Sequence, residues 1–180
     1  MLRILVLASL LLPAAAFARD WQVDSTKSAL TFKGSYQNEA FDGTFKSFDA
    51  TIVYDVANLS ASKFDVSVDL ATAGTGNGDR DDSLKGSDFF DVKKSPKAHF
   101  VTGSFARSAD GGVEAKGSLT LHGQTKPVTL NVKFVENGSA ATLDVDTVLK
   151  RADFGLGAGS DWSDVGADVT VHGHLVLTAK

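Results

Sequence analysis

Strict alternation of apolar and polar side chains is the feature that most constrains the fold of this chain. In residues 63–70, Phe64, Val66, Val68 and Leu70 face one way and polar side chains face the other. A period of two residues is typical of a β-strand with one buried face. The same period recurs, with small departures, at 29–36, 113–122, 128–134, 141–149 and 169–177. The pattern predicts an all-β domain.

Short turn sequences separate these segments. Asp110-Gly111 and Asn137-Gly138 are typical of β-hairpins, and residues 122–127 form a third tight connection. Hairpins join antiparallel strands, so we expect about eight strands in one antiparallel sheet. Such a sheet must close or stack, because free edges pair with other chains. We therefore predict a closed barrel, which can enclose one small ligand. A two-sheet sandwich is the alternative.

Two stretches depart from simple alternation. In residues 41–54 the apolar phase slips between Phe45 and Phe48, which favours a bulge or bend near Lys46-Ser47 in one longer strand. Residues 74–96 do not alternate and predict a short helical insertion around residues 79–92, with Asp79 and Ser87 as N-caps. An insertion of this length is often a lid or binding loop. Its Phe89 and Phe90 are expected to pack over one end of the barrel.

The first 18 residues have the pattern of a cleaved signal peptide. Arg3 precedes an apolar stretch at 4–12, and Ala16-Phe17-Ala18 is a small-x-small cleavage signal. The apolar stretch is shorter than the roughly 20 residues of a spanning helix, which disfavours the alternative of an uncleaved anchor. We expect one mature domain, 19–180, exported to the periplasm, without stable membrane insertion.

Composition excludes several functions. The chain has no cysteine, which rules out disulfides and thiolate metal sites. Its net charge is −4 and its lysines are scattered, so nucleic-acid binding is not expected. We find no nucleophile-elbow or nucleotide-binding motif, and predict no catalytic residue and no cofactor. His172 and His174 lie two residues apart on a predicted outward face, and solvated histidines are favoured over a metal site.

Two arginines are candidates for a polar ligand group. Arg80 lies among three aspartates at 79–82, where it serves either a pocket rim or a helix-capping salt bridge. Arg151 follows a predicted strand, and its planar guanidinium suits a phosphate or carboxylate. The alternative for Arg151 is a structural pair with Asp153 or Asp81. His99 is expected either to contact a ligand or to be a rim or core partner.

A set of short motifs runs in a recognisable order through most of the chain. They are Gly43-Thr44-Phe45, Arg80-Asp81, Asp88-Phe89-Phe90-Asp91, Pro96-Lys97-Ala98-His99-Phe100, Leu119-Thr120-Leu121-His122-Gly123 and Arg151-Ala152-Asp153-Phe154-Gly155. This order resembles the YceI-like family of exported, lipocalin-like, polyisoprenoid-binding proteins. The resemblance implies an extended eight-stranded antiparallel barrel around an apolar tunnel.

The resemblance also implies a ligand, an isoprenoid or similar long-chain lipid of polyprenyl or quinone type. We expect the ligand-binding residues to be Phe32, Phe45, Phe64, Arg80, Phe89, Phe90, His99, Phe100 and Arg151. Two other hypotheses stay open. One is an enzyme that uses His99 with Asp79 or Asp81 as an acid/base set. The other is a filled barrel acting as an interaction protein, in contact with a membrane, a b-type cytochrome or a second copy.

Overall fold

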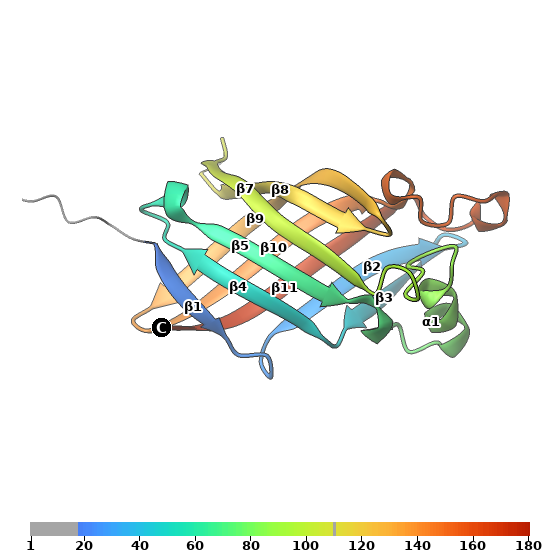
Figure 1. Cartoon of the computed structure of the whole chain (residues 1–180), viewed down its shortest axis with the longest axis horizontal. Helices are drawn as coiled ribbons and strands as arrows, with labels where there is room; N and C mark the ends of the chain where they lie inside the picture. Colours follow the sequence, from blue (N-terminus) through green and yellow to red (C-terminus); the bar gives the residue numbers. More distant parts are fainter. Residues whose placement is uncertain (1–17, 110) are drawn as a thin grey trace, which may run out of the picture.

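The computed structural model describes residues 18–109 and 111–180, so the predicted signal peptide lies outside the described residues except for Ala18. These residues form an elongated β-barrel with one short helix at one end (Figure 1). The strands are β1 (Arg19–Val23), β2 (Ala29–Tyr36), β3 (Glu39–Phe45), β4 (Phe48–Tyr54), β5 (Lys63–Asp69), β6 (Ala73–Gly74), β7 (Lys97–Arg107), β8 (Val113–Leu121), β9 (Gln124–Asn137), β10 (Ala140–Lys150) and β11 (Asp168–Ala179). The helix is α1 (Gly78–Lys85), and the 3-10 helices are η1 (Leu59–Ala61), η2 (Leu70–Thr72), η3 (Arg151–Phe154) and η4 (Ser160–Trp162).

Eight antiparallel strands close the barrel in the order β1-β4-β5-β7-β8-β9-β10-β11, and β11 pairs back onto β1. One edge of β11 carries two neighbours in succession. It pairs with β1 through residues 177–179 and with β2 through residues 170–174. The β2–β3 hairpin therefore lengthens the wall, and β3 pairs in turn with β6. This single closed sheet confirms the predicted barrel.

Residues 41–54 form two strands, so the prediction of one longer strand was wrong, while the predicted bend lies at Lys46. β3 ends at Phe45 and β4 begins at Phe48. The chain changes partners between them, from β2 and β6 to β1 and β5. The backbone N–H of Ser47 donates to the hydroxyl of Thr72 at 3.1 Å instead of to a strand. The phase slip in the sequence therefore marks a strand boundary.

The predicted helical insertion is one helix followed by turns. The N-cap of α1 is Asn77, whose side chain accepts a hydrogen bond from the N–H of Arg80 at 3.0 Å, and not Asp79 as expected. Gly86 ends the helix as predicted. Residues 87–94 form hydrogen-bonded turns in place of a second helical turn. Asp81 anchors the helix, because its Oδ1 accepts both the N–H and the hydroxyl of Thr75 at 2.7 Å.

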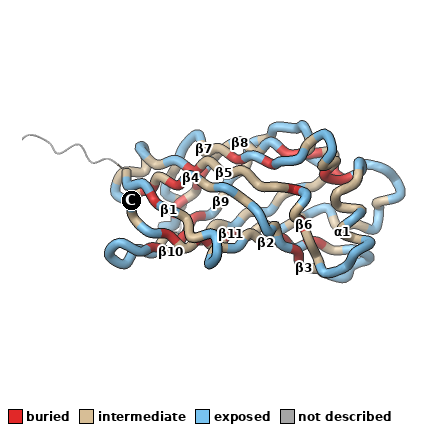
Figure 2. The backbone as a smooth tube through the Cα atoms, turned by 60° about the horizontal axis from the view of Figure 1, so that its bottom comes forward, coloured by how far each residue is buried: buried red, intermediate tan, exposed pale blue. Residues whose placement is uncertain are grey.

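The barrel holds two apolar clusters, one toward each end. The first lies toward the chain termini and includes Trp21, Tyr54 and Phe64. The second lies toward α1 and includes Phe89, Phe90 and Phe154. In Figure 2 buried stretches run along the barrel, while the α1 end carries long exposed loops. Within the part of the chain that the structure describes, no helix is long and apolar enough to span a membrane.

Candidate functional site

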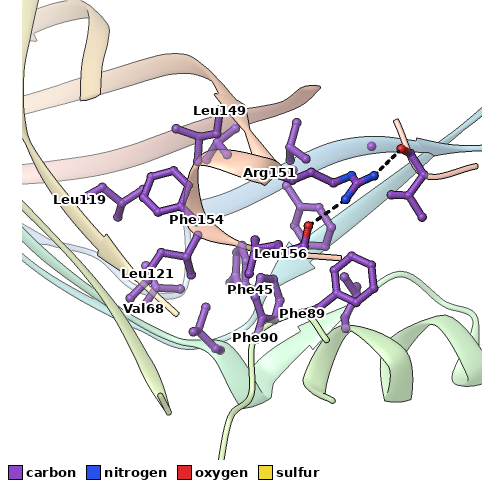
Figure 3. A pocket seen from close by; sticks show the side chains of 18 of the residues that line it. Phe45, Val68, Phe89, Phe90, Leu119, Leu121, Leu149, Arg151, Phe154 and Leu156 are labelled. Carbon is purple, nitrogen blue, oxygen red and sulfur yellow. Dashed lines mark hydrogen bonds between the residues drawn. The ribbon is translucent and has the colours of Figure 1, made fainter. Parts of the chain in front are cut away.

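An apolar cavity of about 160 Å³ lies inside the barrel at the α1 end. Figure 3 shows phenylalanine and leucine side chains converging on it from several strands and from the loops that cover the end. Only Ser35 and Arg151 contribute polar side chains to its lining. The other lining residues are Leu30, Phe32, Gly34, Phe41, Phe45, Val68, Leu70, Leu84, Phe89, Phe90, Ala98, Leu119, Leu121, Leu149, Phe154, Leu156, Val165, Gly166, Val169 and Val171.

Four of the phenylalanines expected at the ligand site do line this cavity. The rings of Phe32 and Phe45 lie 5.1 Å apart, and Phe45 lies 6.0 Å from Phe90. Phe89 lies beside them in the covering turn. Gly43 makes room for this arrangement, because a Cβ at that position would lie 2.2 Å from the tip of the Phe32 ring. Period-two alternation therefore placed the strand-borne rings correctly.

Two other phenylalanines expected at the site lie elsewhere. Phe64 is 1% exposed and packs in the opposite cluster, where its ring lies 4.9 Å from Phe105 and 5.7 Å from Tyr54. Phe100 is buried over Gly117, where a Cβ would approach its ring to 2.7 Å, and it is absent from the cavity lining. Both point inward, as alternation predicts. Their position along the barrel axis keeps them from the cavity.

Several lining residues escaped prediction: Leu84, Phe154 and Val165 lie on covering segments outside the strands, whereas Phe41 lies on β3. Phe41, Leu84, Phe154 and Val165 close the α1 end of the cavity. Of these, Phe154 follows Arg151 in the motif already noted, so its position beside a glycine-rich loop was an available signal. Alternation gives no information on residues outside strands.

Arg151 lines the cavity, but its guanidinium is engaged by the protein itself. It donates to the carbonyl oxygens of Leu156, Gly157, Trp162, Val165 and Gly166 at distances from 2.6 to 3.1 Å. Five N–H donors is the full complement of an arginine. Neither Asp153 nor Asp81 forms an ion pair with Arg151 among the described residues. We therefore assign this side chain to holding the loop over the barrel end.

Arg80 lies at the outer surface of the same end. Its guanidinium sits 4.2 Å from the centre of the Phe41 ring, a cation–π contact. It borders a surface hollow, here called the end hollow, formed by Tyr36, Phe41, Asn77, Asp79, Arg80, Ser83, Leu84, Phe89, Trp162 and Val165. Phe41, Leu84, Phe89 and Val165 line both this hollow and the cavity. One layer of side chains therefore separates Arg80 from the interior.

The covering layer is held by aromatic and polar contacts. The Phe89 ring meets the Trp162 ring edge-on, with 4.8 Å between centroids. The indole N–H of Trp162 donates to a carboxylate oxygen of Asp88 at 3.0 Å. Together with Arg151, these contacts tie the 155–166 loop to the turn that carries Phe89. The 155–166 loop and the turn that carries Phe89 therefore cover this end of the barrel, and we call them the lid.

His99 lies on the outside of the barrel. Its Nε2 atom lies 2.7 Å from Oδ1 of Asp65, and it does not line the cavity. The hydrogen bond from His99, followed by that from Lys63, lowers the pKa of the Asp65 carboxyl. The acid/base set of His99 with Asp79 or Asp81 is thus not assembled, because the partner of His99 is Asp65.

His172 and His174 also face outward, as expected. Their Nδ1 atoms lie 2.8 Å from Asp146 and 2.6 Å from Asp144 on the neighbouring strand. Across the described residues no group of three or more side chains is arranged to hold a metal ion. The interior cavity, lined almost wholly by apolar side chains, is suited to bind an apolar molecule, and among the described residues its lining holds one hydroxyl, that of Ser35, and no carboxylate, histidine or lysine.

A family model described as the YceI-like domain matches residues 21–177 of the chain. The chain belongs to the YceI-like family. A UPF0312 protein of Vibrio cholerae is 33% identical over 154 residues, covering 81% of this YceI-like chain and 82% of that protein. A UPF0312 protein of Pseudomonas putida is 34% identical over 180 residues, covering 94% of each.

Two solved structures superpose on this barrel. BcnA of Burkholderia cenocepacia superposes with a TM-score of 0.81 and 31% identity, over 86% of this chain and 99% of BcnA. A domain of Saccharophagus degradans superposes with a TM-score of 0.68 and 18% identity, over 90% of this chain and 99% of that domain. At that identity the second comparison shows the fold alone.

Proposed function

We propose that this YceI-like protein binds an isoprenoid or similar long-chain apolar lipid, of polyprenyl or quinone type, and carries or stores it. The observation that carries the proposal is the cavity, whose lining is aliphatic and aromatic except for Ser35 and Arg151. An apolar pocket with few polar groups is typical of sites for apolar ligands. The Saccharophagus degradans domain of the same fold is described as a polyisoprenoid binding domain.

The volume of the cavity limits how much of a ligand fits without movement of the lining side chains. An engineered protein cavity of ~150 Å³ binds benzene, so one of about 160 Å³ has room for about one five-carbon unit. A longer chain requires the lining side chains to move apart. Burying each further unit contributes on the order of 3 kcal/mol at ~25 cal/mol per Å². Micromolar to nanomolar binding corresponds to roughly 8–12 kcal/mol. Burial of a few units therefore supplies enough free energy for such binding and also offsets the cost of widening the cavity.

A head group would lie at the end hollow. Arg80 is the only cation in the lining of that hollow, and among the described residues it forms no ion pair. Its charge favours a phosphate or a carbonyl oxygen over an uncharged apolar group. Arg151 is occupied by its five carbonyl partners and serves as a support of the lid.

Export is part of the proposal. The segment 1–18 has the charge, apolar length and small residues of a signal peptide, which directs the mature domain to the periplasm. Fractionation of the native host, with mass spectrometry of the mature N-terminus, tests this. We expect periplasmic protein that begins at Arg19; full-length protein in the cytoplasm would contradict it.

Native mass spectrometry of protein from its own host, followed by organic extraction, tests the ligand. We expect a discrete adduct of isoprenoid composition. In solution, a ubiquinone with a short isoprenoid tail is expected to quench Trp162, which lies at the end hollow, more than Trp21 in the opposite cluster. The Trp162→Phe variant separates the two signals, since the chain has two tryptophans. Protein that carries no lipid and takes up none would overturn the proposal.

A further inference from the structure

The barrel wall contains a seam where two neighbouring strands stop pairing. β9 and β10 form a ladder from Asn137 and Ala140 to Asn131 and Asp146. β9 nevertheless begins at Gln124 and β10 ends at Lys150. Residues 124–130 and 147–150 therefore lie outside this ladder, and we call the gap between them the side seam. In the described part of the wall, the hydroxyl of Thr147 bridges the seam by donating to the carbonyl oxygen of Thr129 at 2.9 Å.

The strands on both sides of the side seam are otherwise fully paired. β8 pairs with residues 124–132 of β9, and β11 pairs with residues 140–150 of β10. The seam is thus a local parting between two intact parts of one wall. Pro127 lies on its edge, and proline, which has no N–H to donate, is typical of a strand edge left unpaired.

A surface groove follows the side seam and reaches the wall of the cavity. The groove includes Val128, Val148, Leu149 and Phe154. Of these, Leu149 and Phe154 also line the interior cavity. Phe154, on η3, is only 2% exposed, so its ring and the side chain of Leu149 stand between groove and cavity. Val148 on the outer edge is 60% exposed.

One hydrogen bond ties the Phe154 backbone to the turn between β8 and β9. The Nδ1 atom of His122 lies 3.1 Å from the Phe154 carbonyl oxygen. His122 occupies the tight turn between β8 and β9 with a positive φ of 50°, a conformation that glycine adopts without strain. This latch connects η3 to the β9 side of the seam. The lid at the end hollow is tied down by the five donors of Arg151, the first residue of η3, and by the Asp88–Trp162 bond.

We propose that the side seam is the gate through which an isoprenoid chain enters and leaves the cavity, with Phe154 as the plug. The inference rests on the proposed function. Opening the wall between two paired strands would break backbone hydrogen bonds, each of which stabilises the fold. At the side seam a ligand can pass between the two strand edges after the Thr147–Thr129 hydrogen bond opens and Phe154 and Leu149 are displaced. Its head group enters first and reaches the end hollow, and the isoprenoid chain follows into the cavity. Val128 and Val148 offer it apolar contact on the way.

A cross-link across the side seam tests the gate. The chain has no cysteine, so Thr129→Cys with Val148→Cys introduces the only thiols, both at exposed positions. A short bis-maleimide then joins the two edges. The control pair is Val135→Cys with Thr142→Cys, which are direct partners in the paired part of the same two strands. Uptake of a ubiquinone with a short isoprenoid tail is followed by Trp162 quenching in a stopped-flow instrument.

We expect cross-linking at the seam to slow uptake and release by about tenfold or more, as closure of a gate does, while the control cross-link leaves both rates unchanged. The His122→Gly variant removes the latch without backbone strain and is expected to speed both rates with little change in equilibrium affinity. Binding by the wild-type protein with equal rates in both cross-linked forms would overturn the gate and leave the proposed function standing. Failure of the wild-type protein to bind would overturn the proposed function, and the gate with it.

Discussion

The Nη1 atom of Arg151 donates to the carbonyl oxygen of Gly157 at 2.6 Å, and this contact ties the end of β10 to the loop that covers the cavity. Gly157 has a positive φ of 58°, and a Cβ there would lie 2.9 Å from the same Nη1 and 3.0 Å from the Phe89 ring. The arginine can reach the loop because residue 157 has no side chain. The lid therefore depends on both residues.

Replacing Arg151 with lysine is expected to lower the free energy of unfolding by about 2–4 kcal/mol, because three ammonium donors cannot serve five carbonyl oxygens and leave some buried without a partner. Urea unfolding measures the change. Lys150→Met is the matched control, since within the described part of the chain the Lys150 side chain forms a single, exposed ion pair, with Asp168, and the change should alter stability by less than about 1 kcal/mol. Equal stability of Arg151→Lys and wild type would show that other contacts hold the loop.

Gly157→Ala is expected to cost more than the ~1–2 kcal/mol of placing a side chain in the left-handed region, because the new Cβ also meets Arg151 and Phe89. Gly138→Ala provides the control. Gly138 has a similar φ of 63° with open space around its Cβ position, so alanine there loses stability only through the unfavourable backbone conformation. Unfolding midpoints of the two variants give the difference, and identical midpoints would contradict a packing requirement at residue 157.

Asp81 is expected to make the lid sensitive to acid. Hydrogen bonds from the hydroxyl and N–H of Thr75 lower the pKa of Asp81 below its ordinary value of 3.8. A carboxyl with a lowered pKa stabilises the fold above its unfolded pKa and loses this contribution as the pH falls through the folded pKa. Asp81→Asn should thus be less stable than wild type at pH 7. Plotted against pH, the free energies of unfolding of the two proteins should converge below about pH 3.8. A difference that stays constant with pH would refute the linkage.

Filling the cavity is expected to block the ligand without harming the fold. Ala98 on β7 lines the cavity, so Ala98→Leu adds bulk to a space that is already empty. Uptake of a ubiquinone with a short isoprenoid tail should fall about tenfold or more, while the unfolding midpoint stays level or rises. Ala106→Leu places the same change on the same strand away from the cavity and should bind normally. Unchanged uptake by Ala98→Leu would place the ligand elsewhere.

Alternation of apolar and polar residues in the sequence predicted most of the barrel strands and part of the cavity lining. Leu119, Leu121, Val169 and Val171 were expected inward from their period of two, and all four line the cavity. The same period could not separate Phe45 from Phe64. Both point into the barrel, but the distance along its axis depends on register and strand order, which join residues far apart in the chain.

Charged side chains show the limit of sequence reasoning more sharply. Arg151 was a candidate for a head group because of its chemistry, yet its five acceptors are backbone carbonyls that any sequence would contain. His99 contacts Asp65 because β5 and β7 are neighbours in the sheet. The two residues are 34 positions apart in the sequence.

The sequence by itself determined the all-β class, the inward and outward faces, the tight turns and the apolar character of the interior, because these follow from local periodicity and from residues with special backbone preferences. Tertiary structure alone decided where β11 divides between β1 and β2, where the β9–β10 ladder stops, and which inward side chains leave a space between them. These features depend on the twist and register of strands that close on one another, and no local segment contains that information.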